Sequence, residues 1–479
     1  MSSASRKYEN EMVAAGSYAE WLQAAKALDH LEGKDQWRQE KESAEYDFQL
    51  IDSRAALLHR LRRGKDYDQL VFRLREELHG NLGNMANPVL YQQARYGTKQ
   101  LINDYLDEVT AALNLLCDSD VKILPPSRKR RFFNRAARSF GRSALLLSGG
   151  ASLGLFHIGV IEELMKQSLL PQVITGASAG AVVGGFLATH SDAELRQALR
   201  PDELKYQWIR LYGLSDVLKG EGLFDPKQLI QSIKRNIHDL TFIEAYEKTG
   251  RILNISVSPA DPHQFPRLLN YLTSPNALIR QAALASSAVP GLFPPVQLRA
   301  RNYAGKSVPY VPQSRWIDGS VHEDIPKEKV NRLHNVNHYI VSQTNPHVVP
   351  FLNDDAEKTG VLPFLQDVIV KGPMLQVEHV LDLVHRYFDV PGLSSIIKKA
   401  HAIVGQTYSG DITISPGRSE LSMSKVFVNA SEADARRLIE AGRRATWPRI
   451  ERIRNTTQIS RTFSACLQRL GERYKYVKR

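Results

Sequence analysis

The segment ALLLSGGASLGLFHIGVIEELMKQSLLPQVITGASAG, residues 144–180, decides the fold. It contains two short apolar runs, 144–147 and 173–175, and each is followed by a turn of small residues and then by a helical pattern. A repeated order of strand, turn and helix predicts parallel strands joined by right-handed crossovers, and therefore the α/β fold class. Three later apolar runs predict further strands, at 251–258, 338–342 and 411–414.

The second of these turns has the sequence Gly176-Ala177-Ser178-Ala179-Gly180, which is a G-x-S-x-G motif between a strand and a helix. Small neighbours allow the sharp turn that exposes a serine hydroxyl, and the helix N-terminus that follows favours negative charge nearby. The pattern predicts Ser178 as a nucleophile. The alternative is a small-residue turn that matches the motif by accident.

The first turn, Ser148-Gly149-Gly150-Ala151-Ser152-Leu153-Gly154, is rich in glycine and also leads into a helix. It lacks the G-K-[ST] ending of a phosphate-binding loop and the G-x-G-x-x-G spacing of a dinucleotide site. Backbone amides in such a turn can stabilise an oxyanion, which suits a serine nucleophile one crossover later. The alternative is close packing of the helix on the strand.

A serine nucleophile needs a base, and the residues alone leave its identity open. The downstream histidines have no distinctive surroundings, and His157 on the first helix is expected to lie in the core. Asp318 follows the apolar pair Trp316-Ile317 and precedes Gly319, within the sequence RWIDGS at 315–320. It could be the base or a plain turn residue. The downstream histidines are His322, His334, His338 and His347.

These motifs together resemble those of the patatin-like phospholipases and acyl hydrolases. The family has a glycine-rich oxyanion loop, G-x-S-x-G, an A-S-x-A-x-P-x-x-F-P-P block and a distant D-G-[GA], in this order. The corresponding stretches here are GGASLG, GASAG, residues 285–295 and DGS, and the resemblance covers about 144–345. The chain departs from the family pattern at Ala151, Leu153 and Ser320, where glycine, a basic residue, and glycine or alanine are usual.

Other stretches are similar to one patatin-like subgroup, which has a helical N-terminal region and includes triacylglycerol (storage-lipid) lipases. These stretches are 17–37, 97–99, Tyr105, 337–347 and 410–414. The resemblance implies a three-layer α/β fold with a mainly parallel central sheet. It also implies a division into a helical N-terminal domain (1–126), a basic linker (127–143), a catalytic core (144–346) and a mostly helical C-terminal region (347–479) that could add strands to the core.

For function, the resemblance implies a serine lipid acyl hydrolase with a dyad of Ser178 and Asp318 and no histidine between them. Asp318, in the Asp318-Gly319-Ser320 motif, would take the serine proton with a pKa near the reference value of about 3.9. The amides of Gly149, Gly150 and Ala151 would stabilise the oxyanion, and an acyl-enzyme would form without metal or cofactor. The alternatives are a Ser-His-Asp esterase of the α/β-hydrolase type and a non-catalytic lipid-binding protein.

Charge indicates the kind of partner. Lys plus Arg number 63 and Asp plus Glu 51, which gives a formal net charge of +12. The segment SRKRRFFNRAARSFGR, residues 127–142, combines seven basic residues with three phenylalanines and no acid. It could lie on an anionic lipid surface with its rings in the interface, or it could be a solvated linker. Nucleic acid is not expected, because no recognition motif accompanies the charge.

The remaining composition excludes several classes of protein. With 479 residues, 43% hydrophobic and 24% charged, the chain is neither disordered nor fibrous. Two cysteines cannot form a disulfide framework, and the N-terminus lacks an apolar signal region. No uninterrupted apolar run suggests a membrane span. We therefore expect a cytoplasmic protein that associates peripherally with lipid, with residues 361–383 as either a lid or ordinary core packing.

Overall fold

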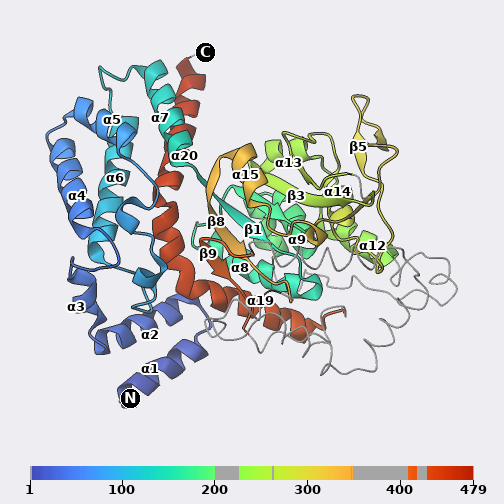
Figure 1. Ribbon diagram of the computed structural model, residues 1–479, viewed down its shortest axis with the longest axis horizontal. Helices are drawn as coiled ribbons and strands as arrows, with labels where there is room; N and C mark the ends of the chain where they lie inside the picture. The colour runs from blue at the N-terminus through green and yellow to red at the C-terminus, as the bar shows by residue number, and fades with distance from the viewer. Residues whose placement is uncertain are drawn as a thin grey trace.

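The computed structural model describes residues 3–199, 226–261, 264–346, 348, 408–417 and 429–477. These residues form an α/β core beside a helical body, and the C-terminal helix α20 (Ile450–Val477) packs along the helical body (Figure 1). The N-terminal helices and the C-terminal helix therefore lie side by side although they come from opposite ends of the sequence.

A mainly parallel sheet of seven strands forms the centre of the described α/β core, as predicted. Its order is β4-β3-β2-β1-β8-β9, and β7 pairs with β3. Only β4 and β7 run antiparallel to their neighbour β3. The predicted strands are all present. The strands are β1 (Arg142–Leu147), β2 (Val173–Gly176), β3 (Ile252–Pro259), β4 (Arg267–Leu269), β7 (Trp316–Asp318), β8 (Val336–Ser342) and β9 (Ile412–Ile414), with a separate pair of β5 (Arg299–Arg301) and β6 (Ser307–Pro309).

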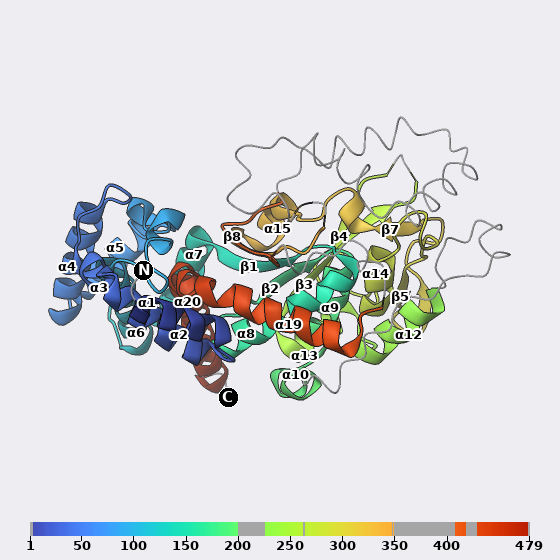
Figure 2. The ribbon, with the colours of Figure 1, turned by 90° about the horizontal axis from the view of Figure 1, so that it is seen from below.

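Helices cover both faces of the sheet, which gives the three layers that the sequence predicts. Leu145 and Leu147 of β1 point into the core beneath one face, and Ala144 and Leu146 point into a smaller core on the other. Figure 2 shows α15 on one side of the sheet and α8 and α19 on the opposite side. The helices of the core are α8 (Leu155–Lys166), α9 (Ala179–Thr189), α10 (Asp192–Ala198), α12 (Pro226–Asn236), α13 (Phe242–Thr249), α14 (Ile279–Ser286), α15 (Lys327–His334) and α19 (Glu432–Thr446).

The helical body has its own apolar core, to which α4, α5, α6, α7 and α20 contribute. Ile102, Val109 and Leu116 of α6 recur at helical spacing and are fully buried, and Phe463 of α20 packs into the same cluster. The helices of the N-terminal region are α1 (Ser3–Ala14), α2 (Tyr18–Leu31), α3 (Lys34–Gln39), α4 (Phe48–Arg63), α5 (Tyr67–Glu76), α6 (Gln100–Asp118) and α7 (Pro126–Phe140).

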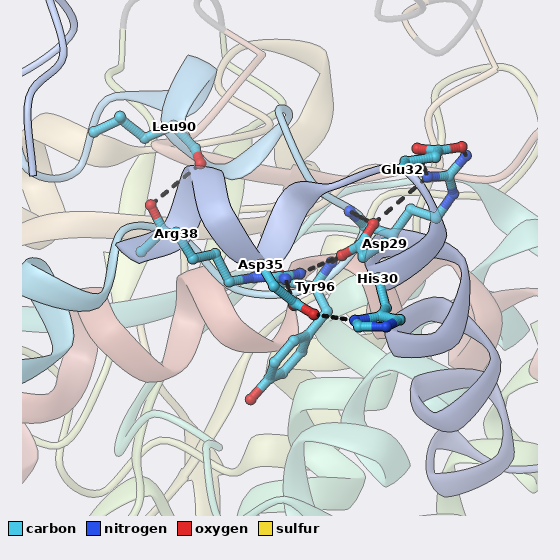
Figure 3. Close-up of polar contacts among 9 residues, drawn as sticks. Asp29, His30, Glu32, Asp35, Arg38, Leu90 and Tyr96 are labelled. Carbon is cyan, nitrogen blue, oxygen red and sulfur yellow. Dashed lines mark hydrogen bonds and ion pairs between the residues drawn. The ribbon is translucent and has the colours of Figure 1, made fainter. Parts of the chain in front are cut away.

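A buried carboxylate joins the first helices of this region to a distant loop. Asp29 of α2 forms an ion pair with Arg38 of α3, and it accepts the backbone N–H groups of Arg95 and Tyr96 at 3.1 and 3.2 Å (Figure 3). Arg38 also donates to the Tyr96 carbonyl at 2.7 Å. Three segments therefore meet at a single side chain that is inaccessible to solvent.

The basic segment at 127–142 is not a linker, and its rings do not face lipid. Most of it is the helix α7, in which Phe132, Phe133 and Phe140 are buried in the helical body. The rings of Phe133 and Phe140 lie 6.3 and 6.0 Å from that of Phe463. The aromatic residues share one helical face, so burying them in protein leaves the arginines on the other face.

Three further expectations concern a membrane span, the two cysteines and a lid. Within the described ranges, no helix is both long and apolar enough to cross a bilayer. The two cysteines are buried free thiols, and Cys117 of α6 contacts the backbone of Cys466 in α20. Residues 361–383, which we considered as a lid, lie outside the described residues.

Candidate functional site

The register of the sheet brings the serine turn and Asp318 to the same place. Gly176 at the end of β2 pairs with Ile255 of β3, and Asp318 at the end of β7 pairs with Val257. The strand β3 has β4 on one edge and β2 on the other. Val257 pairs with β4 on the first edge, so its pairing with β7 must be on the second edge, where β2 also lies. The two pairing positions are two residues apart, or about 7 Å along the strand. Residues about 140 positions apart in sequence therefore become neighbours.

Ser178 occupies a strained turn between β2 and α9. Its φ of 52° lies in the left-handed region, which costs about 1–3 kcal/mol for a residue with a side chain. The turn is tight because a Cβ on Gly176 would lie 2.2 Å from the Gly180 carbonyl oxygen. The Ser178 N–H donates to Ser286 Oγ at 3.0 Å, and Ser286 donates to the Ser256 carbonyl. These contacts keep the strained turn in place.

The Asp318 carboxyl group is fully buried, and one of its oxygens is left for Ser178. Oδ1 accepts the backbone N–H and the hydroxyl of Ser320, both at 2.8 Å. Oδ2 is buried without a partner in good hydrogen-bond geometry among the described residues. The Ser178 side chain is nevertheless close enough for its hydroxyl to lower the pKa of Asp318. Catalytic hydrogen bonds are often poorly aligned before substrate binds.

Burial makes Asp318 a stronger base than the sequence predicts. Loss of hydration disfavours the charged form and raises the pKa of Asp318 to about 6, although hydrogen bonds from Ser178 and Ser320 oppose this. The expected pKa near 3.9 is therefore wrong. A pKa just below neutrality keeps the carboxylate ionised at pH 7 and improves its ability to accept a proton.

The glycine-rich loop lies beside Ser178, and its three predicted oxyanion amides differ in whether they already have a hydrogen-bond partner. The Gly149 N–H donates to Asp324 Oδ1 at 2.8 Å, so it is not free to stabilise an oxyanion as predicted. The N–H groups of Gly150 and Ala151 make no hydrogen bond to any described residue. Ala151 has a φ of 50° and lies at the wall of a pocket that Ser178 also lines.

That pocket is a largely apolar cavity of about 140 Å³. Its walls come from the loop η3 (Ala151–Gly154), α8, α9, α12 and the segment after α14. The apolar side chains that line it include Leu155, Val183, Phe186, Leu229 and Phe293. The apolar lining suits an apolar ligand, and Ser178 lies at the wall of the pocket.

The described histidines lie elsewhere. His157 is fully buried in α8 and bonds Ser342 and the Ser148 carbonyl, and burial lowers its pKa to about 4. His322, His334 and His338 bond Ser258, Asn254 and Ser143 respectively, while His347 lies outside the described residues. None of the described histidines bonds to Ser178, whose own contacts are with Ser286, Ser287 and Asp318.

Two residues of this region were not singled out from the sequence. Ser286 was quoted only as part of the 285–295 block, although it holds the backbone of Ser178. Asp324 carries no local signal, since it is an acid in a short polar loop. Both act across more than 100 residues of sequence, which no spacing argument addresses.

Comparison with known proteins identifies the family. Residues 145–328 match the family described as patatin-like phospholipase, and residues 1–138 match a domain of unknown function, DUF3336. "Triacylglycerol lipase ptl3" of Schizosaccharomyces pombe is 36% identical over 484 residues, which cover 98% of each chain. The chain belongs to the patatin-like phospholipases.

Two further relatives of this patatin-like phospholipase are longer than the chain. "Triacylglycerol lipase 4" of Saccharomyces cerevisiae is 36% identical over 466 residues, covering 92% of this chain and 50% of that protein. "Triacylglycerol lipase SDP1L" of Arabidopsis thaliana is 34% identical over 478 residues, covering 96% and 58%. The chain thus spans only about half the length of these two proteins.

The family and its relatives confirm the predicted class of enzyme, a carboxylic ester hydrolase acting on lipid acyl groups. The predicted subgroup is confirmed as well, because the DUF3336 match accompanies the patatin-like match. The DUF3336 match extends to residue 138 and so includes nearly all of α7 (Pro126–Phe140).

Proposed function

We propose that the chain cleaves lipid acyl esters with Ser178 as nucleophile and Asp318 as the base. Asp318 takes the proton of the Ser178 hydroxyl as Oγ attacks the ester carbonyl carbon. The tetrahedral intermediate then collapses, and the alcohol leaves with that proton. Asp318 then takes a proton from water as the water oxygen attacks the acyl-enzyme, and it returns this proton to Ser178 Oγ as the fatty acid is released. The observation that carries this proposal is the fully buried Asp318 carboxyl beside a strained serine at the wall of an apolar pocket.

The negative charge of the intermediate needs donors close to Ser178. We assign this role to the N–H groups of Gly150 and Ala151, because they have no partner among the described residues and Ala151 lines the pocket beside Ser178. Each such donor is worth about 3–4 kcal/mol of transition-state stabilisation. The N-terminus of α9, directly after Ser178, adds a favourable dipole.

We infer that the substrate is a neutral acylglycerol such as triacylglycerol. The apolar lining of the pocket suits a fatty acyl chain. Three relatives with 34–36% identity carry the name triacylglycerol lipase. Among the described residues that line the pocket, none has the cationic side chain that a phosphate headgroup would favour.

We further propose that the protein meets its substrate by peripheral association with an anionic lipid surface. The outer face of α7 exposes Arg128, Arg131, Arg135 and Arg138, and the helix contains no acidic residue. Arginines close to an anionic membrane contribute about 1 kcal/mol each. The buried phenylalanines take no part, so the attraction is electrostatic.

The activity is tested by measuring fatty-acid release from triolein emulsions by the wild type, Ser178→Ala and Asp318→Asn. Ser178→Ala should reduce release to the uncatalysed background, and Asp318→Asn should reduce kcat by about 10²–10⁴-fold, the usual contribution of a general base. Both changes are close to isosteric, so circular dichroism should be unchanged. Wild-type activity of Asp318→Asn together with inactivation by a histidine substitution would favour a Ser-His-Asp enzyme. Undiminished release by Ser178→Ala would refute the proposal.

A further inference from the structure

A second buried carboxylate lies beneath the glycine-rich loop. Asp324 follows the short helix η4 (Gly319–Val321) and is almost inaccessible to solvent. Its Oδ1 accepts the Gly149 N–H at 2.8 Å, and its Oδ2 accepts from Asn345 Nδ2 at 3.3 Å. One side chain thus connects the segments that follow β1, β7 and β8.

Gly149 links the Asp324 carboxylate to the surroundings of Ser178. A Cβ added to Gly149 would lie 3.3 Å from the Cβ atoms of both Ser178 and Ser320. The Gly149 carbonyl accepts the Thr344 hydroxyl at 3.1 Å, so both polar groups of this residue have fixed partners. Any displacement of Gly149 would move the two amides that follow it.

Those two amides belong to a segment that does not hold its conformation by itself. Ala151 has a φ of 50°, a left-handed value that costs an alanine about 1–3 kcal/mol. Such a conformation persists only when surrounding contacts impose it. The Asp324 contact two residues earlier is a charge-assisted hydrogen bond when the carboxylate is ionised, which is the stronger kind.

We propose that Asp324 is a positioning residue, which fixes Gly149 so that the Gly150 and Ala151 amides are directed at the oxyanion formed on Ser178. This inference rests on the proposed function. Asp324 acts through the backbone of Gly149 and does not contact the substrate itself. Its loss should therefore reduce kcat more than it changes KM, because the oxyanion exists only in the transition state and the intermediates.

The charges of Asp324 and Asp318 also affect each other's pKa. Burial and, to a smaller extent, the negative charge of Asp318 together raise the pKa of Asp324 to about 7, against hydrogen bonds from Gly149 and Asn345. Coupling between two carboxylates is mutual, so ionised Asp324 also disfavours ionised Asp318. The other titratable groups near this loop are Tyr408, whose pKa is raised by burial and by Asp324, and His157, which is neutral above pH 4.

The test compares Asp324→Asn with Asp324→Ala on a soluble p-nitrophenyl acyl ester. The asparagine keeps an oxygen that can accept the Gly149 N–H but carries no charge, whereas the alanine removes the acceptor. We expect Asp324→Ala to lower kcat by about 10²-fold or more, the typical effect of losing one oxyanion donor, with little change in KM. Asp324→Asn should restore most of kcat, and the acid limb of its pH profile should stay close to that of the wild type, because Asp324 has the higher pKa and is already mostly neutral where Asp318 ionises.

Three outcomes would overturn the inference. The first is a wild-type kcat in Asp324→Ala, and the second is an equal loss of kcat in Asp324→Asn and Asp324→Ala. The third is a loss of kcat of about 10²-fold or more in Asp324→Asn with its fold intact, and this readout remains decisive if the alanine variant fails to fold. Failure of the proposed function would look different, because Ser178→Ala would then retain activity whatever the Asp324 variants do.

Discussion

At the scale of single residues, the chemistry of the site depends on how Asp318 is solvated. Burial raises its pKa and the two hydrogen bonds from Ser320 lower it, and the balance is a pKa of about 6. The hydroxyl of Ser320 is a departure from the usual family motif. It donates to Oδ1 and leaves Oδ2 for Ser178. The substitution of serine for glycine or alanine therefore strengthens the ionised state of the base.

This balance predicts the effect of Ser320→Ala on the pH profile. Removing the hydroxyl removes one hydrogen bond that favours the carboxylate, so the pKa of Asp318 should rise above about 6. Because the base must be ionised, the acid limb of kcat/KM should move to higher pH, with activity at pH 9 nearly unchanged. Ser287→Ala, which removes a nearby hydroxyl that does not contact Asp318, should leave the limb in place. An unmoved limb in Ser320→Ala would show that Asp318 is not the titrating base.

The sequence identifies the candidate site residues themselves, but it does not identify the distant residues that form hydrogen bonds with them. Ser178, the glycine-rich loop and Asp318 each follow a strand in a local motif, so they can be found without coordinates. The contact of Gly149 with Asp324 spans 175 residues, and that of Ser178 with Ser286 spans 108. Such contacts depend on sheet register. The pKa of Asp318 depends on how deeply the folded chain buries its carboxyl group. Neither these long-range contacts nor this burial can be predicted from a local sequence pattern.

At the scale of elements, periodicity predicts a helix or strand but does not say what its apolar face contacts. The parallel strands are found because each is a short apolar run bounded by turn residues. In α7 the rings and arginines also alternate at helical spacing, and a lipid surface and a protein core would both satisfy that pattern. The contacts with Phe463, more than 300 residues away in sequence, decide between them.

The junction of α2, α3 and the loop at 95–96 predicts a specific loss of stability. Asp29→Ala removes a buried carboxylate, so two backbone N–H groups lose their acceptor and Arg38 keeps only Asp35 and the Tyr96 carbonyl. Breaking a buried ion pair in this way costs roughly 3–5 kcal/mol. Urea unfolding should therefore show a clearly lower midpoint for the helical body.

The matched control for this change is Asp35→Ala. Asp35 also pairs with Arg38, at 2.7 Å, but its side chain is 52% exposed (Figure 3). Exposed ion pairs contribute little, so its unfolding midpoint should stay close to that of the wild type. Equal midpoints for the Asp29 and Asp35 variants would contradict the structural role assigned to burial of Asp29.

At the scale of the whole molecule, the helix α7 of the helical body and the pocket beside Ser178 lie at opposite ends of the strand β1. The helix α7 leads into the start of β1, whereas the glycine-rich loop follows the end of β1. A contact between α7 and a lipid surface would therefore be distant from Ser178 and the glycine-rich loop. Lipid binding and ester cleavage should respond independently to substitution.

Reversing charge on α7 tests this separation. Arg128→Glu with Arg131→Glu should weaken binding to vesicles of phosphatidylserine and phosphatidylcholine by tenfold or more, since each arginine near the surface contributes about 1 kcal/mol. Cleavage of a soluble ester should not change. Arg60→Glu with Arg63→Glu on α4 is the control, and vesicle co-sedimentation at low and high salt is the measurement. Salt-insensitive binding equal to that of the wild type would exclude α7 as the contact surface.

We propose above all that Ser178 carries the acyl group during turnover, with Asp318 as its base. The most direct test of this proposal is mass spectrometry of the protein quenched in acid during turnover of a p-nitrophenyl acyl ester. We predict that the peptide containing Ser178 gains the mass of one acyl group in the wild type, and that Ser178→Ala and Asp318→Asn show no such gain. Fatty-acid release with no acylated Ser178, or with the acyl group on another residue, would contradict the account.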